Sequence, residues 1–246
     1  MTGVRLSYVV PVHNQEAVLP DTVSRLAARL REHPGSEVLL VENGSTDGSQ
    51  AVCVALASAV DTPDVRVHAA NSARGLGHAL RRGMEMARGE VIVLTAADLP
   101  FGFSDLDAYL AMRPAPQLAI GSKGHPESHV TTSRLREVMS GMFRALRLLI
   151  LGLHVRDSQG TILIQSSLAR RILPYLRCSG FLITTEVVYA AQRAGEAAVE
   201  LPITYTAGGT STVSPLRDST RMAFGLLSLR RRLRHITIAP AEAGAS

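Results

Sequence analysis

Apolar runs alternate with amphipathic stretches along the first part of the chain. Each apolar run carries β-branched or aliphatic residues in succession, which is typical of strands buried on both faces. The runs cover residues 6–12, 37–42, 65–69 and 91–94. Between them, leucine and alanine recur at helical spacing in residues 16–32, 51–60 and 75–87. Strands and helices that alternate through short loops predict an α/β fold with a parallel, right-handed sheet.

The second part of the chain continues with less regular alternation. Helical patterns occupy residues 104–112, 133–153, 183–194 and 216–234. Strand patterns occupy residues 118–121, 161–165 and 198–205. Residues 124–132 are polar and irregular, which predicts a loop. We expect one domain over residues 1–235 and a disordered tail at 236–246.

The fourth apolar run stops abruptly at small residues, one carboxylate and a proline, in the order Thr95-Ala96-Ala97-Asp98-Leu99-Pro100. Open α/β sheets bind ligands at the carboxyl ends of their strands, so Asp98 is placed where an acidic group is useful. The alternative is that Asp98 only caps the turn before Pro100. The loops after the other strands bear on this choice, because they meet at the same edge.

Charge and cysteine content narrow the class of protein. The 246 residues carry a formal net charge of +5 with a pI near 9.8, which favours phosphates, a membrane surface or nucleic acid as partners. Nucleic acid is the least favoured, because basic residues are not interleaved with aromatic ones and no binding motif occurs. Two distant cysteines, with no signal-peptide core or membrane-spanning run, predict a cytoplasmic protein.

Two common nucleotide-binding motifs are missing. The loop after the first strand reads Pro-Val-His-Asn, not Gly-x-Gly-x-x-Gly, and no Gly-x-x-x-x-Gly-Lys-Ser/Thr loop occurs. A dehydrogenase and a P-loop NTPase are therefore disfavoured. Gly75-Leu76-Gly77 begins a helix, so its amides could face a phosphate, although such a pair more often marks tight packing.

Taken together, the loops resemble those of glycosyltransferase family 2. Residues 9–16, Val-Val-Pro-Val-His-Asn-Gln-Glu, are similar to the Val-x-Pro-x-Tyr-Asn-Glu-Glu opening of that family. Residues 41–49, Val-Glu-Asn-Gly-Ser-Thr-Asp-Gly-Ser, are similar to its Val-Asp-Asp-Gly-Ser-x-Asp-Gly loop. The segments at 75–89, 96–99, 121–123, 136–140 and 156–159 resemble the dolichyl- or polyprenyl-phosphate mannose and glucose synthases within the family.

This resemblance implies the GT-A fold, an α/β fold whose mostly parallel central sheet is flanked by helices, here with a C-terminal amphipathic helical extension. It divides the domain into a nucleotide-sugar-binding half at 1–122 and an acceptor-binding half at 123–235. By position in the family motifs, the implied nucleotide-sugar-binding residues are Pro11, His13, Glu16, Glu42, Asn43, Gly44, Arg74, Gly75, Gly77, Ala97 and Asp98. For each of them, capping or shaping of a loop is the alternative role.

The implied metal site departs from the family pattern at Ala96. The family carries Asp-Ala-Asp-Leu where this chain has Ala96-Ala97-Asp98-Leu99, and alanine cannot bind a metal. Asp98 is then the expected ligand for Mg²⁺ or Mn²⁺, in a weakened site shared with the diphosphate of the donor. The alternative is that Arg74 or Lys123 supplies the positive charge without a metal.

The resemblance further implies an inverting reaction in which Asp98, Asp157 and Glu186 are catalytic. A phosphate acceptor needs no general base, whereas a hydroxyl acceptor would need one, for which Asp157 and Glu186 are the candidates. The alternatives are an ion pair with Arg156 or a loop cap for Asp157, and a solvated helix face for Glu186. The implied acceptor-binding residues are Lys123, Arg136 and Gln159.

Three functions are consistent with these motifs. The first is hexose transfer to a polyprenyl phosphate by a cytoplasmic protein that contacts the inner, anionic face of the membrane through the basic amphipathic helices at 133–153 and 216–234. The second is transfer to a soluble hydroxyl or amine in a small-molecule pathway. The third is a catalytically silent subunit that binds nucleotide sugars. The sequence leaves the oligomeric state open.

Overall fold

The computed structural model of the chain describes residues 5–60, 62–131, 134–206, 215–236 and 238, with the side chains of 131, 134–136, 206 and 215–221 excepted. The first part contains β1 (Leu6–Val12), α1 (Leu19–Leu30), β2 (Ser36–Glu42), α2 (Ser49–Ala59), β3 (Val65–Asn71), α3 (Leu76–Met86), β4 (Val91–Leu94), α4 (Ser104–Ala111) and β5 (Leu118–Gly121). The second part contains β6 (His129–Thr131), α5 (Arg134–Leu151), β7 (Ile162–Gln165), α6 (Ser166–Ile172), the 3₁₀ helix η1 (Leu173–Tyr175), α7 (Ile183–Arg193), β8 (Val199–Leu201), β9 (Thr204–Thr206) and α8 (Pro215–Leu233).

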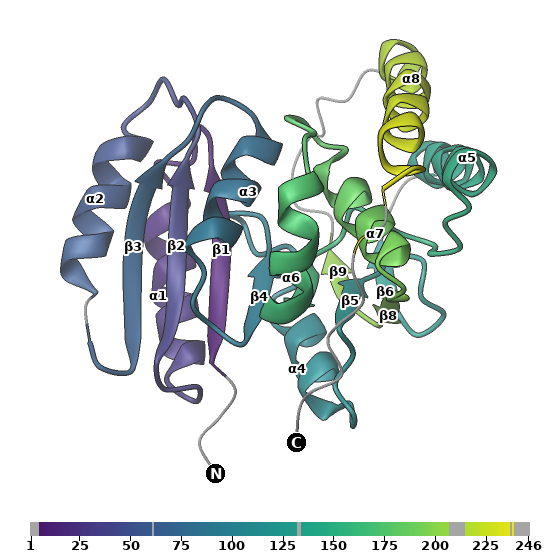
Figure 1. The fold of residues 1–246 in the computed structure, drawn as a ribbon. Coiled ribbons are helices and arrows are strands. Elements are labelled where there is room, and N and C mark those ends of the chain that lie inside the picture. Colours follow the sequence, from purple (N-terminus) through teal and green to yellow (C-terminus); the bar gives the residue numbers. More distant parts are fainter. Residues whose placement is uncertain (1–4, 61, 132–133, 207–214, 237, 239–246) are drawn as a thin grey trace.

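Within these ranges one sheet of seven strands runs through the molecule in the order β3-β2-β1-β4-β7-β5-β8. Figure 1 shows β3, β2, β1 and β4 side by side in this order. The strands β1 to β4 pair in parallel, as the sequence predicts, whereas β7 is antiparallel to both β4 and β5. Val12 pairs with Glu42, and Glu42 pairs with Asn71. Three strands therefore end side by side, which brings their following loops to one edge of the sheet.

Helices cover both faces of this sheet, so its strands are apolar on both sides. On one face Val9, Leu39 and Ile92 pack with residues of α3, α6 and α7. On the other face Tyr8, Val10 and Leu40 pack with residues of α1 and α4. The alternation of neighbouring residues between the two clusters follows from the two-residue period of a strand. Each fully buried aliphatic side chain contributes about 1.5–3 kcal/mol of burial free energy.

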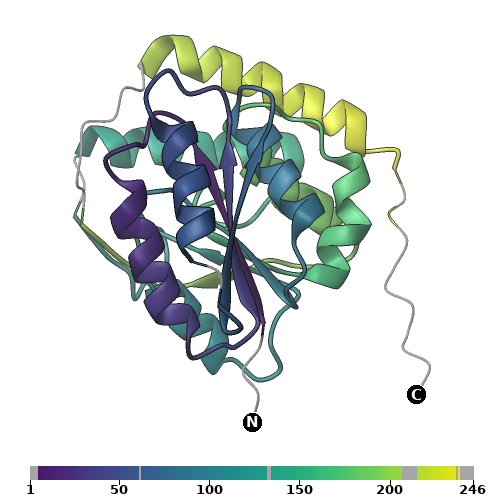
Figure 2. The same cartoon turned by 90° about the vertical axis from the view of Figure 1, so that its left-hand side faces the viewer.

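The C-terminal helix α8 packs against α5 and α7, as the two views in Figures 1 and 2 show. Leu226, Leu229 and Leu233 recur at helical spacing and are fully buried in the cluster that also holds α7. The predicted C-terminal extension is thus part of the core. Among the described residues, no helix is long and apolar enough to span a bilayer.

Two predictions about local structure are wrong. The strand predicted at 198–205 is divided into β8 and β9, because Pro202 has no N–H to donate and ends the ladder. β9 then pairs with β6, which lies inside the loop predicted at 124–132. Pairing between segments that distant has no local sequence signal. The central sheet takes strands from both sides of residue 122, so the two predicted halves share one sheet. Of the predicted tail, residues 237 and 239–246 lie outside the described residues.

Asp105, at the start of α4, is buried, and burial raises the pKa of its carboxyl to about 6. Because the folded protein holds this proton more tightly than the unfolded chain, stability is lost as pH rises from about 4 to about 6. We expect Asp105→Asn, which keeps an acceptor for the Leu106 N–H, to be about 2 kcal/mol more stable than wild type near pH 7. The gain should vanish near about pH 4 in urea unfolding. An equal gain at both pH values would contradict this.

Candidate active site

The loops that leave β1, β2, β3 and β4 meet at the carboxyl edge of the parallel strands. Asn43 links three of them. Its Nδ2 donates to the Val12 carbonyl at 2.7 Å, and its Oδ1 accepts from the Gly75 N–H at 3.2 Å. The Asn43 N–H also donates to Val12, at 3.0 Å. Asn43 is buried, so these bonds are shielded from water, and the expected nucleotide-binding residues of the three loops are brought together.

Glu42 is buried beside Asn43 at the end of β2. Burial opposes its ionisation, but hydrogen bonds from Ser45 and Gly44 and the nearby His13 outweigh burial and lower the pKa of the carboxyl. The charged form is therefore the stable one at neutral pH. The Nδ1 atom of His13 is buried and has no hydrogen-bond partner among the described residues. A buried ring nitrogen beside a carboxylate is a suitable contact for a base or a ribose hydroxyl.

Glu16 and the first loop are attached to the second loop by further hydrogen bonds. Asn14, which has a positive φ of 54°, accepts from the Thr46 N–H at 2.8 Å. The Glu16 carboxylate accepts from the Gly48 N–H at 2.8 Å. Glu16 is thus exposed, and its carboxylate holds the loop after β2 through the Gly48 N–H. Pro11 lies one residue before the end of β1, in register with Val41, and it is half-buried.

Gly44 brings Arg74 to the same edge. With a φ of +81°, Gly44 occupies the left-handed region that favours glycine, and a Cβ there would lie 3.3 Å from the Cβ of Arg74. The Arg74 side chain is exposed beside it. An exposed guanidinium at this edge is able to approach an anionic ligand.

Of the two roles open to the Gly75-Leu76-Gly77 segment, the structure favours close packing over amides that face a phosphate. The Gly75 N–H donates to Asn43, and the Gly77 N–H donates to the carbonyl of Ser179 at 2.8 Å. A Cβ on Gly77 would lie 1.9 Å from the Cys178 carbonyl oxygen, so only glycine allows this approach. Both glycines therefore serve close packing, the alternative role of such a pair.

The β4 loop presents one carboxylate. Asp98 is exposed and makes no side-chain hydrogen bond or ion pair within the described ranges. Ala97 is buried, and its carbonyl accepts from the Thr22 hydroxyl, so it shapes the loop rather than facing a ligand through its side chain. No group of three metal-ligating side chains occurs in the part of the chain that the structure describes. The residues present thus fit a divalent ion held by Asp98 together with a diphosphate and water, not a resident metal.

Asp157 and Lys123, both on the side predicted to bind the acceptor, lie together. The Asp157 carboxylate accepts from the Gln159 N–H at 2.8 Å and from the Lys123 N–H at 3.4 Å. The Lys123 ammonium lies 4.1 Å from the ring centroid of Tyr205 and 5.7 Å from that of Phe101. These cation–π contacts hold an exposed positive charge in place. Gln159 is exposed, while the side chain of Arg136 lies outside the described residues.

Glu200 connects the segments around Ser122 and Asp157, and no sequence motif indicated it as a site residue. Its Oε1 accepts from the Ser122 hydroxyl at 2.5 Å, the Arg156 N–H at 3.0 Å and the Asp157 N–H at 3.1 Å. Arg147, also missed as a site residue, is 1% exposed and donates to the Arg156 carbonyl at 3.0 Å. The sequence feature that could have indicated Glu200 is its position as a glutamate inside the apolar strand pattern at 198–205.

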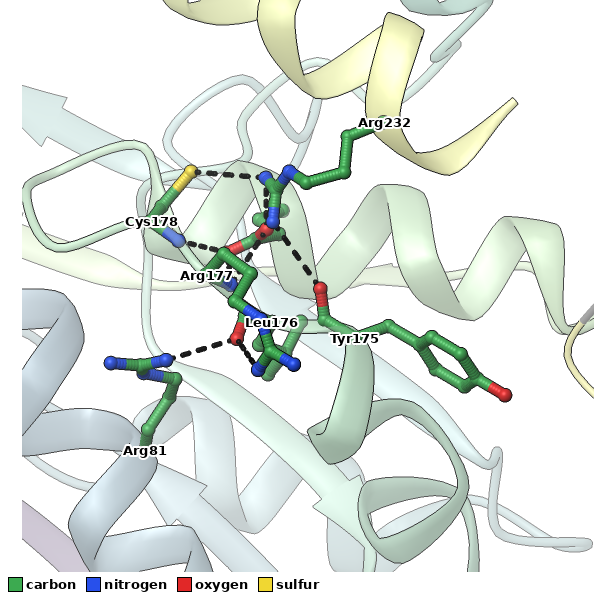
Figure 3. Close-up of polar contacts among 7 residues, drawn as sticks. Arg81, Tyr175, Leu176, Arg177, Cys178 and Arg232 are labelled. Carbon is green, nitrogen blue, oxygen red and sulfur yellow. Dashed lines mark hydrogen bonds and ion pairs between the residues drawn. The ribbon is translucent and has the colours of Figure 1, made fainter. Parts of the chain in front are cut away.

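Glu186 lies in α7 and is fully buried, not on a solvated helix face. Its carboxylate accepts from the Cys178 N–H at 2.7 Å, from the Arg177 N–H and from the guanidinium of Arg232. Figure 3 shows Arg232 reaching from α8 towards Cys178 and the Tyr175 carbonyl. With both oxygens occupied and no solvent exposure, the carboxylate is placed to position the chain rather than to accept a proton from a substrate.

Comparison with known proteins decides the family. The model of Glycosyl transferase family 2 matches residues 7–169. The chain belongs to glycosyltransferase family 2. The relatives of this family 2 enzyme include dolichyl-phosphate beta-glucosyltransferases of Drosophila melanogaster and Homo sapiens. The first is 28% identical over 92% of this chain and 74% of its own length, and the second is 29% identical over 95% and 76%.

Solved structures confirm the fold. Glucosyl-3-phosphoglycerate synthase from Mycobacterium tuberculosis, solved with Mn²⁺, UDP-glucose and phosphoglyceric acid, matches with a TM-score of 0.65 at 18% identity. The match covers 98% of this chain and 82% of that protein. The GT-A fold expected from the motifs is thus confirmed, and the chain is a family 2 hexosyltransferase.

Asp98→Asn tests the assignment of the β4 loop. Because the side chain is exposed and unpartnered within the described ranges, we expect the melting temperature to stay at the wild-type value. Sugar transfer should fall by about 100-fold or more, since the side chain would no longer hold a divalent ion that offsets the charge of the leaving diphosphate. Asp64→Asn, an exposed carboxylate at the opposite end of β3, is the matched control. Wild-type turnover in Asp98→Asn would contradict the assignment.

Proposed function

We propose that this family 2 enzyme transfers a hexose from a nucleoside-diphosphate sugar to a polyprenyl phosphate, with inversion at the sugar C1. The observation that carries the proposal is the match to dolichyl-phosphate beta-glucosyltransferases, which covers 92–95% of this chain and 74–76% of those proteins. Glucose is accordingly the first sugar to test. The exposed cations near Asp157 support an acceptor that carries negative charge.

The proposal includes peripheral contact with an anionic membrane surface. Two neighbouring helices carry large exposed apolar side chains, namely Val138, Met142, Leu148 and Leu149 on α5 and Phe224 and Leu227 on α8. Arg144 on α5 and Arg230 and Arg231 on α8 are also exposed. Exposed apolar residues beside arginines favour an interfacial position on anionic lipid. A polyprenyl phosphate would be presented at such a surface.

A phosphate acceptor suits the arrangement around Asp157. The second pKa of a phosphate monoester is about 6, so the dianion is present at neutral pH and attacks the sugar C1 without a general base. Lys123, Arg136 and Gln159 would bind and orient it. Asp157 holds the loop through the N–H groups of Gln159 and Lys123. With a hydroxyl acceptor, Asp157 would be the base.

The donor would lie at the edge formed by the β1 to β4 loops. Glu42, His13 and Asn43 would contact the base and ribose, and Asp98 would face the diphosphate. A divalent ion bound there would offset the charge that develops on the leaving diphosphate. Arg74 and Lys123 are the cations available if the reaction proceeds without an ion.

A transfer assay tests the proposal directly. UDP-, GDP- and dTDP-hexoses are incubated with a short polyprenyl phosphate, each with Mg²⁺ and with EDTA. We expect lipid-linked product with UDP-glucose, and loss of product in EDTA. No lipid product, with transfer to a soluble hydroxyl or amine, would overturn the acceptor assignment. Nucleotide-sugar binding without transfer to any acceptor would identify a silent subunit.

Lys123→Met tests the acceptor side separately. We expect the acceptor KM to rise by about tenfold, the equivalent of one lost charge-assisted contact, while the donor KM changes less than about twofold. Lys123→Arg keeps the charge over Tyr205 and is the control that should retain the wild-type acceptor KM. Equal changes in both KM values would indicate that Lys123 only supports the fold.

A further inference from the structure

The loop at 176–180 lies against the start of α3, on the donor side of the enzyme. Its Ser179 carbonyl accepts from the Gly77 N–H at 2.8 Å, and its Leu176 carbonyl accepts from Arg81 of α3 at 3.0 Å. The missing side chain of Gly77 allows the Cys178 carbonyl to come this close. The position of this loop and the position of the α3 start therefore depend on each other.

The same loop is held from its other side by one ion pair. The Glu186 carboxylate accepts from the N–H groups of Arg177 and Cys178, and it pairs with Arg232 at 2.5 Å. Arg232 also donates to the Tyr175 carbonyl at 3.3 Å and lies 3.8 Å from the Cys178 sulfur (Figure 3). Arg232 thus contacts the chain before the loop, inside the loop and on α7.

These contacts continue from the loop to the expected nucleotide site. Gly77 follows Gly75, whose N–H donates to Asn43, and Asn43 in turn holds the Val12 carbonyl. A hydrogen-bonded path therefore leads from α8, through Arg232, Glu186 and the 176–180 loop, to the ends of β1 and β2. Apart from Arg232, whose side chain is partly exposed, the links join backbone groups or buried side chains, so beyond Arg232 a shift is passed on through close-packed groups.

The Glu186 carboxylate depends on its donors, because its side chain has no contact with solvent. A carboxylate that is fully buried has lost its hydration, and the guanidinium and two N–H groups replace that hydration. Cys178 has no separate chemical role here, because burial and the nearby Glu186 raise the pKa of its thiol to about 12. The cluster is therefore a structural connection and not a nucleophile with its base.

We propose that Glu186 and Arg232 are positioning residues that hold the 176–180 loop against α3 and so set the affinity for the nucleoside-diphosphate sugar. Through them, the packing of the C-terminal helix α8 is coupled to the donor site. The inference rests on the proposed donor position at the edge of β1 to β4. It assigns to α8 a role in donor binding in addition to its proposed place at the membrane surface.

The test compares Arg232→Met with Arg170→Met, which changes an exposed arginine of α6. Binding of UDP with Mn²⁺ is measured by calorimetry, and donor KM and kcat are measured by transfer. We expect Arg232→Met to weaken UDP binding by about tenfold, the size of a charge-assisted hydrogen bond, with kcat at saturating donor changed less than about threefold. Arg170→Met should bind UDP as wild type does.

Two further variants keep the inference open to refutation if Arg232→Met is poorly folded. Arg232→Lys keeps the charge next to Glu186 but loses the second arm to Tyr175, so an intermediate affinity is expected. Glu186→Gln should weaken UDP binding as Arg232→Met does. Folded variants with wild-type affinity for UDP would overturn the inference. Wild-type enzyme that binds no UDP would instead overturn the proposed donor site.

Discussion

The site depends most on the side chain of Asn43. One buried amide donates to the end of β1 and accepts from the start of α3, so a single residue connects the loops after β1, β2 and β3. Parallel pairing places these loops at the same edge, but their relative positions need a connection across the gap between strands. Asn43 is suited to this because an amide both donates and accepts, which a carboxylate at neutral pH does not.

Two buried or half-buried glutamates perform the same task on the remaining loops. Glu200 gathers the Ser122 hydroxyl and the N–H groups of Arg156 and Asp157, and Glu186 gathers those of Arg177 and Cys178. Several hydrogen-bond donors take the place of water around each carboxylate, so they offset the free-energy cost of its desolvation. The candidate catalytic residue Asp98 is more exposed than these two supporting residues, whereas Asp157 is half-buried, as Glu200 is. A candidate catalytic loop whose backbone is held by a second carboxylate, as Glu200 holds Asp157, is consistent with an enzyme that is pre-organised before its substrates bind.

The sequence predicts the first part of the fold well, because β1 to β4 are continuous apolar runs separated by amphipathic helices. It fails where structure depends on distant partners. The pairing of β6 with β9 joins segments about 75 residues apart, and the antiparallel insertion of β7 between β4 and β5 has no local pattern. In the site, loop motifs pointed to Asp98, Glu42 and Asn43. Glu200 and Arg232 carried no motif, since their roles arise only from the neighbours that the fold gives them.

A crystal structure of the enzyme with UDP-glucose and Mn²⁺ tests the central assignment most directly. The account predicts the uracil and ribose between the loops of β1 and β2, in contact with His13, Glu42 and Asn43. It places the diphosphate and the ion beside Asp98, and the sugar C1 on the side that faces Asp157. Nucleotide bound at any other surface, or an ion held without Asp98, would contradict it.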